Sequence, residues 1–64
     1  MTIAVKLKEA REKCGKTQKE VAESVGIQQS TLANYETGTR VPRDQIKEKL
    51  AKCYGVTVQE LFFN

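Results

Sequence analysis

The sequence has no histidine and only two cysteines, Cys14 and Cys53, which lie far apart along the chain. A zinc finger needs closely spaced Cys and His ligands, and a Cys-His catalytic pair needs a histidine, so neither site can be built. The sequence also offers no nucleophile with an adjacent base and no carboxylate pair in an evident cleft. We therefore expect no enzymatic activity, no metal and no cofactor, and we expect both thiols to be small, buried apolar side chains.

Long apolar runs are also missing. The triplet Leu61-Phe62-Phe63 is as long as any in the chain, whereas a membrane-spanning helix needs roughly 20 apolar residues. The N-terminal residues do not combine a basic leader with an apolar stretch, as a secretory signal would. The sequence therefore predicts a cytoplasmic protein that does not associate with a membrane.

Glycine and proline are scarce, with four and one in 64 residues, while 39% of the residues are hydrophobic and 30% are charged. This composition is typical of a folded globular chain, and the length allows one small core. We expect residues 1–64 to form a single domain. Eleven basic and eight acidic residues leave a net charge of +3, which permits a polyanionic partner without requiring one.

Apolar residues recur at helical spacing along the chain, and no β-type alternation of useful length is present. Thr17 and Glu20 have the pattern of a helix capping box, and Thr57 and Glu60 repeat it. Pro42 suits the first turn of the fourth helix. The sequence thus predicts an all-α fold of five short helices, at about 3–14, 18–25, 28–36, from 42 to about 54, and from about 58 onward.

The helix predicted at 28–36 has two distinct faces. Leu32, Tyr35 and Glu36 fall on the inner face together with Thr31, at the angles that a helix gives successive residues. The opposite face is small and uncharged, whereas a face turned only to water more usually carries Lys and Glu. This face is therefore the first indication of a binding surface, and its members are Gln29, Ser30, Ala33 and Asn34.

A short connection containing Gly26 joins the second and third predicted helices, as in a helix-turn-helix. The segment from Gln18 to Tyr35 resembles the helix-turn-helix of the Cro and lambda-type repressor family, also called the XRE family. The run from Thr31 to Gly38 is similar to that family's signature, in which an aromatic residue and a glutamate precede a glycine. Further matching residues are Arg11, Val21, Ala22, Val25, Ile27, Pro42, Gly55, Val56 and Leu61. The resemblance implies a lambda-repressor-like fold that binds double-stranded DNA through its second and third helices.

Base recognition is implied for the third helix, which in this family enters the major groove by its N-terminal end. Gln29 and Ser30 would then meet base edges first, and Asn34 would lie farther along. A glutamine or asparagine can bond bidentately to adenine, and the small Ala33 would allow close approach or touch a thymine methyl group.

Phosphate contacts are implied for the residues around this helix. Gln18 begins the second helix, where the counterpart in similar proteins bonds the DNA backbone. Gly38 and Thr39 could offer backbone amides, and nearby cations would add a salt-dependent attraction. Thr31 could contact a phosphate or simply pack against its neighbours. The cations considered are Lys19, Arg40 and Arg43, although an isolated surface cation is often only solvated.

Glu36 lies beside the apolar stripe of the third helix, where an unpaired carboxylate would be destabilising. In similar proteins the partner is an arginine of the first helix, which corresponds to Arg11 here. The resemblance therefore predicts a structural ion pair between Arg11 and Glu36.

The C-terminal region carries more apolar surface than one small core is expected to absorb. Phe62 and Phe63 are adjacent, so they cannot both face inward on a helix; Phe62 suits the core better and Phe63 suits an interface. The binding face of the third helix has no Arg or Lys, so one copy should bind DNA weakly. We expect a two-fold dimer, with recognition helices about 34 Å apart on a palindromic operator, through Val56, Val58, Phe62 and Phe63.

The leading interpretation is a sequence-specific DNA-binding transcriptional regulator of bacterial or phage type, most often a repressor. An antitoxin, a restriction-modification controller and the detached DNA-binding half of a larger repressor share the fold and remain open. A protein-interaction module is the alternative from another class. The polar outer face of the third helix lacks the aromatic or leucine anchors expected of such a module, and nothing in the sequence indicates a small-molecule ligand.

Overall fold

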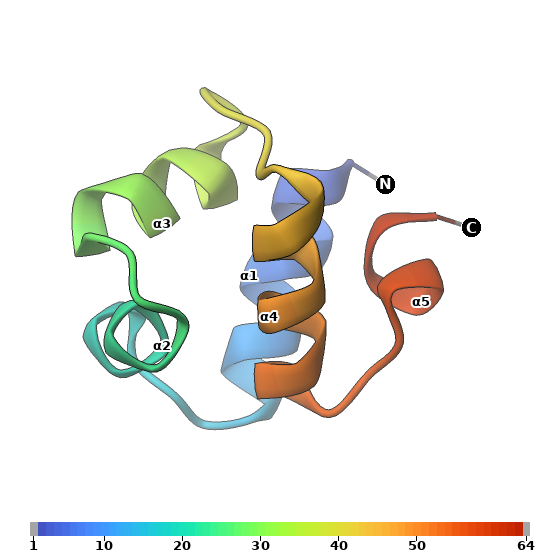
Figure 1. The fold of residues 1–64 in the computed structure, drawn as a ribbon, viewed down its shortest axis with the longest axis horizontal. Coiled ribbons are helices and arrows are strands. Elements are labelled where there is room, and N and C mark those ends of the chain that lie inside the picture. The colour runs from blue at the N-terminus through green and yellow to red at the C-terminus, as the bar shows by residue number, and fades with distance from the viewer. Residues whose placement is uncertain (1, 64) are drawn as a thin grey trace.

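The computed structural model describes residues 2–63, and over this range the chain forms five α-helices and no strand (Figure 1). The helices are α1 (Ile3–Lys13), α2 (Gln18–Val25), α3 (Gln29–Thr37), α4 (Asp44–Tyr54) and α5 (Val58–Phe62). The predicted all-α fold of five short helices is confirmed. Within residues 2–63, no helix has both the length and the apolar character that crossing a membrane requires.

Threonine side chains cap three of the helices. The hydroxyls of Thr2, Thr17 and Thr57 each accept a hydrogen bond from the backbone amide three residues later, at 3.3, 3.1 and 3.0 Å. At α2 the Glu20 carboxylate also accepts from the Thr17 amide at 2.9 Å, which completes the predicted capping box. That bond is the main reason that the pKa of the Glu20 carboxyl lies below its ordinary value. At α5 the Glu60 carboxylate bonds the Thr57 hydroxyl instead, at 3.2 Å, so the second box forms only in part.

The turn at residues 26–28 joins α2 to α3 and makes the predicted helix-turn-helix. Gly26 has a φ of 85°, in the left-handed region that a Cβ atom opposes. The amides of Gly26 and Ile27 donate to the Ala22 carbonyl at 2.9 and 3.0 Å and so close the end of α2. Ala22 itself is only 2% exposed, because α2 packs against both α3 and α4.

The connection between α3 and α4 differs from the prediction. Helix α4 begins at Asp44, and Arg43 is its N-cap, with an extended backbone. Pro42 therefore lies before the helix and not in its first turn. Proline's preference for helix starts marked the right region, but Pro42 is buried and serves as an apolar residue of the connection.

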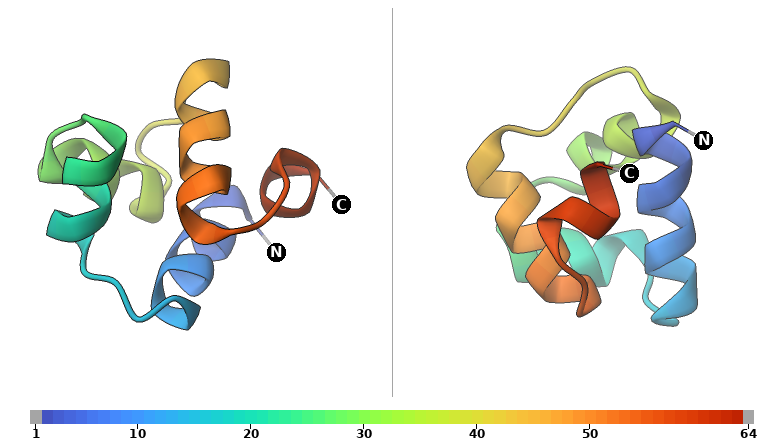
Figure 2. Two further views of the ribbon diagram at one scale, coloured as in Figure 1. Left: turned by 60° about the horizontal axis from the view of Figure 1, so that its bottom comes forward. Right: turned by 90° about the vertical axis from the view of Figure 1, so that its right-hand side faces the viewer.

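The core lies among all five helices, and it places α3 and α5 on opposite sides of the molecule. In Figure 1, α4 crosses in front of α1, with α2 and α3 on the left and α5 on the right. The right-hand view of Figure 2 shows α5 between α1 and α4. Leu7, Leu32 and Leu50, from α1, α3 and α4, are completely buried. The other buried apolar residues include Val21, Ala22, Val25, Tyr35, Ala51, Tyr54, Leu61 and Phe62.

The two cysteines correct the sequence analysis. Both are free thiols, and Cys14 is exposed while Cys53 is half-buried. Cys14 is the C-cap of α1, past the part of the helix that faces the core, and its thiol donates to the Tyr54 carbonyl at 3.5 Å. The Cys53 sulfur lies 3.8 Å from Lys16 Nζ. The expectation of two buried thiols is therefore wrong. Cys14 lies beyond Ala10 of α1, which still packs against the core, and Cys53 on α4 packs against the core only in part.

Candidate nucleic-acid interface

The first turn of α3 projects from the molecule. Gln29 and Ser30 are exposed, whereas Ala33 and Asn34, one turn later on the same face, are half-buried. In Figure 1 and in the left view of Figure 2, α3 begins at the outer edge of the molecule. The four predicted base-reading residues therefore share one accessible face, and the two at the N-terminal end have the most free surface.

The opposite face of α3 is fixed in the core. Leu32 is completely buried, Tyr35 is 8% exposed, and α3 packs against α1 and α2. Thr31 is half-buried at the border between the two faces. Because the inner residues hold the helix rigidly, the outer side chains are presented in a fixed direction, which is what a recognition helix requires.

Exposed cations lie on the segments that flank α3. Lys19 is in the first turn of α2, and Arg40 and Arg43 are in the connection to α4, and all three are exposed. Their positions are compatible with phosphate contacts on either side of the recognition helix.

The backbone amides after α3 correct one detail of the sequence analysis. The amides of Gly38 and Thr39 both donate to the Asn34 carbonyl, and the Arg40 amide does so at 3.2 Å. These bonds satisfy the carbonyl at the end of α3. The expectation that Gly38 and Thr39 offer free amides to phosphate is therefore wrong, although the Thr39 side chain is exposed and bonds the Thr37 hydroxyl at 3.0 Å.

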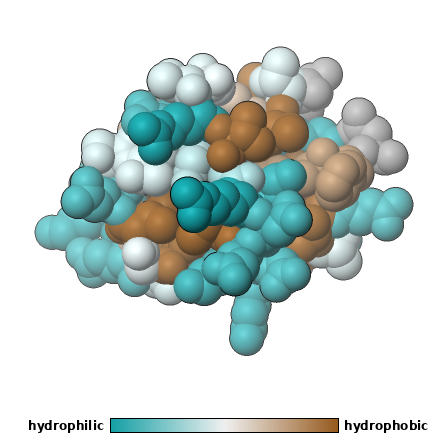
Figure 3. Space-filling model, turned by 45° about the horizontal axis from the view of Figure 1, so that its top comes forward, coloured by the Kyte–Doolittle hydropathy of each residue, from teal (hydrophilic) through white to brown (hydrophobic). Residues whose placement is uncertain are grey.

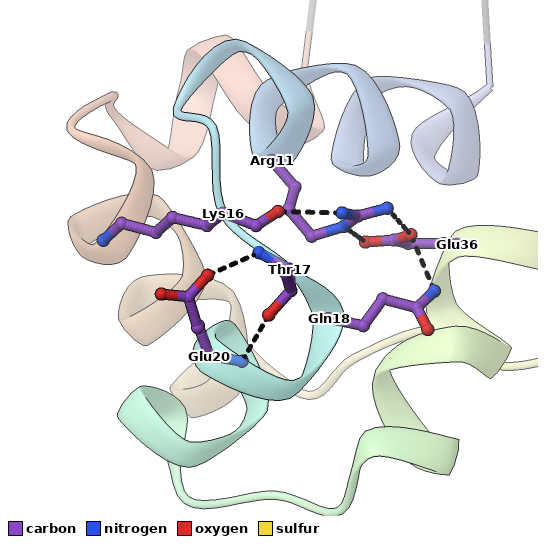
Figure 4. Close-up of polar contacts among 6 residues, drawn as sticks. All are labelled: Arg11, Lys16, Thr17, Gln18, Glu20 and Glu36. Carbon is purple, nitrogen blue, oxygen red and sulfur yellow. Dashed lines mark hydrogen bonds and ion pairs between the residues drawn. The ribbon is translucent and has the colours of Figure 1, made fainter.

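A buried polar network ties α1, α2 and α3 together (Figure 4). Arg11 Nε and Nη2 donate to the two carboxylate oxygens of Glu36 at 2.8 and 3.1 Å, so the ion pair expected from the resemblance is present. Arg11 Nη1 also donates to the Lys16 carbonyl at 2.9 Å. Gln18 Nε2 donates to Glu36 Oε1 at 3.1 Å. Glu36 thus accepts three hydrogen bonds in a place where its side chain is 3% exposed.

The same network raises the pKa of Arg11 above its ordinary value, chiefly because Glu36 accepts its hydrogen bonds. The guanidinium therefore stays charged, and its pair with Glu36 links α1 to α3. Such a link is destabilising to break, because one buried charge would remain without a partner.

Two features of this surface were not predicted from the sequence. Gln18 was expected only at a phosphate, and its bond to Glu36 depends on how α2 crosses α3, which no local pattern reports. Gln28 occupies the N-cap position of α3, but its side chain makes no cap hydrogen bond and is exposed beside Gln29.

The predicted dimer residues lie around α5, away from α3. Phe63 is 57% exposed, whereas Phe62 is 6% exposed and belongs to the core. Val56 and Val58 are half-buried. Phe62 therefore has little surface left for a dimer contact, and Phe63 is the aromatic residue that remains accessible.

Lys47 covers part of this aromatic surface. Its Nζ lies 5.3 Å from the centroid of the Phe62 ring and 5.7 Å from that of Phe63, within the range of a cation–π contact. On the face shown in Figure 3, brown apolar patches alternate with teal hydrophilic side chains, so the exposed apolar surface is divided.

Comparison with known proteins shows where similar sequences occur. Residues 7–61 match the sequence model of a family described as helix-turn-helix. The chain is 43% identical over 61 residues to the HTH-type transcriptional regulator ImmR of Bacillus subtilis, and the alignment covers 95% of this chain and 48% of that protein.

Two further relatives carry similar descriptions. The cryptic phage CTXphi transcriptional repressor RstR of Vibrio cholerae is 41% identical over 56 residues, covering 88% of this chain and 50% of that protein. An uncharacterized HTH-type transcriptional regulator of Archaeoglobus fulgidus is 32% identical over 60 residues, covering 94% of this chain and 86% of that protein. The chain spans about half the length of the first two relatives.

Proposed function

This chain belongs to the helix-turn-helix family of DNA-binding transcriptional regulators, and from that premise we propose that it represses transcription by binding a specific palindromic operator as a dimer. Members of the family act by binding DNA and are not enzymes. The proposed role places the chain in the cytoplasm of a bacterium, where the operator lies.

The exposed, uncharged first turn of α3 is the observation that carries this proposal. Gln29 and Ser30 project beyond the core, and neither has a long aliphatic stem or a charge. Amide and hydroxyl groups of this kind bond base edges in the major groove. A surface that contacted only water or only the DNA backbone would not need side chains suited to hydrogen-bonding base edges.

Phosphate contacts would fix the position of α3 in the groove. We assign them to Gln18, Lys19, Arg40 and Arg43, with the half-buried Thr31 and the exposed Thr39 side chain as further candidates. Lys and Arg provide the salt-dependent part of the affinity, because each phosphate contact releases condensed counterions. The few cations flanking α3 give one copy only a modest affinity.

Two copies are therefore needed for tight binding. The described chain measures 27 × 23 × 21 Å, so one copy cannot place a second recognition surface about 34 Å away in the next major groove. We assign the dimer contact to Phe63, with contributions from Val56 and Val58. This surface surrounds α5, on the side of the molecule opposite α3.

Selection of binding sites from random DNA duplexes tests the proposal. We expect enrichment of a palindrome whose half-sites are about one helical turn apart. A salt titration on the selected duplex should then show that Arg43→Ala lowers the slope of log affinity against log salt by about 1. Equal recovery of all duplex sequences would contradict sequence-specific binding, and recovery of an unrepeated site would contradict the dimer.

A further inference from the structure

Gln18 is hydrogen-bonded to Glu36, which has the most deeply buried charged side chain among residues 2–63. Glu36 Oε1 accepts from Gln18 Nε2 at 3.1 Å, and the Glu36 side chain is 3% exposed. Gln18 itself is half-buried and stands at the first position of α2. Gln18 therefore connects the buried Glu36 carboxylate to the outward-facing N-terminal end of α2.

The carboxylate decides which way the Gln18 amide points. An ionised carboxylate can only accept hydrogen bonds, so the amide must turn its NH2 group toward Glu36 and its carbonyl away. Figure 4 shows this orientation, with the Gln18 nitrogen toward Glu36 and the oxygen on the far side. An amide nitrogen has two hydrogens, so one remains for a second acceptor.

Glu36 cannot easily move away from this position. Two donors of Arg11 bind its carboxylate at 2.8 and 3.1 Å, and the third donor of Arg11 binds the Lys16 carbonyl at 2.9 Å. Arg11 thus fixes the carboxylate from α1, and the Lys16 carbonyl, in the chain segment that leads to Gln18, holds Arg11 in place. A rigid acceptor in a buried site restricts its partner more than an exposed one does.

We propose that Glu36 is a positioning residue for DNA binding, which holds the Gln18 amide so that its second N–H donates to a phosphate oxygen of the DNA backbone. This inference rests on the proposed function, in which Gln18 contacts phosphate. The ion pair then has two roles, since it joins α1 to α3 and also fixes a side chain at the DNA surface in advance of binding. Ordering a free glutamine on binding would otherwise lower the affinity by about 2- to 12-fold.

A double-mutant cycle tests the inference. Arg11→Met/Glu36→Met replaces the ion pair by apolar side chains of similar size, a change that buried pairs often tolerate without loss of stability. The cycle combines it with Gln18→Ala, and each of the four proteins is titrated with the selected operator duplex at a temperature where denaturation curves show it fully folded. Ser24→Ala, at an exposed position of α2 outside both proposed surfaces, is the control.

We expect Gln18→Ala to weaken binding roughly tenfold in the wild-type chain, as the loss of a hydrogen bond to a charged group does. In the Arg11→Met/Glu36→Met background, the same substitution should cost at least threefold less, because Gln18 is already disordered there. If Gln18→Ala weakens binding equally in the wild-type chain and in Arg11→Met/Glu36→Met, while the wild-type chain binds the operator, the positioning role of Glu36 is overturned and the proposed function is not. A wild-type chain that binds no duplex would overturn the proposed function and this inference with it.

A second measurement does not depend on the folding of any variant. Nitrogen-15 relaxation of side-chain amides in the free wild-type chain should show Gln18 as rigid as the backbone, and Gln29 and Gln59 as mobile. A Gln18 amide as mobile as these two exposed glutamines would contradict the inference, since nothing would then be fixed before DNA binds.

Discussion

Two buried polar side chains, Glu36 and Tyr54, differ in their hydrogen bonding. Glu36 accepts three hydrogen bonds from Arg11 and Gln18. Tyr54 is 5% exposed, and its hydroxyl oxygen is buried without a hydrogen-bond partner among residues 2–63. Burial, and then the nearby Glu36 carboxylate, raise the pKa of Tyr54 well above its ordinary value of 10.0. A satisfied group supports the fold, whereas an unsatisfied one weakens it.

Tyr54→Phe is therefore expected to keep the fold and to raise the free energy of unfolding at pH 7 by up to about 1 kcal/mol, since it removes a buried hydroxyl without a partner. Urea denaturation followed by circular dichroism measures the change. A loss of more than about 1 kcal/mol would show that the hydroxyl has a stabilising partner after all.

The same variant makes a prediction for alkaline pH. The folded chain keeps Tyr54 neutral, whereas the unfolded chain ionises it at about pH 10. The contribution of Tyr54 to the free energy of unfolding is therefore fully present below pH 10 and falls as the pH rises. At pH 11 the wild type should have lost about 1 kcal/mol more than Tyr54→Phe has lost. Parallel stability curves for the two proteins between pH 9 and 11 would contradict the raised pKa.

Some residue roles could be predicted from the sequence and others could not. The exposure of Gln29 and the burial of Leu32 follow from helical phase, which is a local property of the sequence. The bond between Gln18 and Glu36 joins two helices and depends on the packing of α2 on α3. The engagement of the Thr39 amide likewise depends on how α3 ends.

At the scale of elements, the turn at Gly26 determines how α3 is placed relative to α2. Gly26 has a φ of 85°, and a Cβ added there would meet no atom within 4 Å. The constraint on this residue is therefore the backbone conformation itself and not a lack of space. A side chain at this position would strain the turn without any clash to relieve.

Gly26→Ala is accordingly expected to lower the free energy of unfolding by about 1–2 kcal/mol, the penalty for a Cβ in the left-handed region. Ser24→Ala, at an exposed position of α2 two residues earlier, serves as the control and should change stability by less than about 0.5 kcal/mol. Thermal denaturation of both variants measures the difference. Equal stability of the two would mean that the turn adapts without strain.

The elements themselves were largely predictable because their signals are local. The Thr17–Glu20 capping box and the glycine after α2 lie within a few residues of the helix ends that they mark. Errors occurred where the tertiary structure decides the outcome. Pro42 is buried in the connection before α4, and Cys14 lies just past the part of α1 that packs against the core.

At the scale of the whole molecule, α3 and α5 lie on opposite sides of one small core. This arrangement allows a dimer to form through α5 while both copies of α3 remain free. Phe63 is 57% exposed on the α5 side of the molecule, and its ring lies next to the Lys47 ammonium. Two-fold pairing would bury two such rings, and aromatic residues dominate interfaces of this kind.

Phe63→Ser should therefore weaken the proposed dimer roughly tenfold or more, while the stability of the single chain changes by about 0.5 kcal/mol or less. Sedimentation equilibrium of the chain alone and on operator DNA measures the association. Val41→Ser, which alters another exposed apolar residue away from α5, is the control and should associate as the wild type does. Identical association of Phe63→Ser and the wild type would place the dimer contact elsewhere.

Sequence-specific binding by the exposed turn of α3 is the claim on which the account depends, and one comparison tests it most directly. The affinities of wild type, Gln29→Ala and Ser24→Ala are measured at one salt concentration, for the selected operator and for a scrambled duplex. We predict that Gln29→Ala loses about 5- to 150-fold on the operator, the equivalent of one base contact, and nothing on the scrambled duplex. Ser24→Ala, outside both proposed surfaces, should match the wild type on both. Wild-type affinities of Gln29→Ala for both duplexes would contradict the claim.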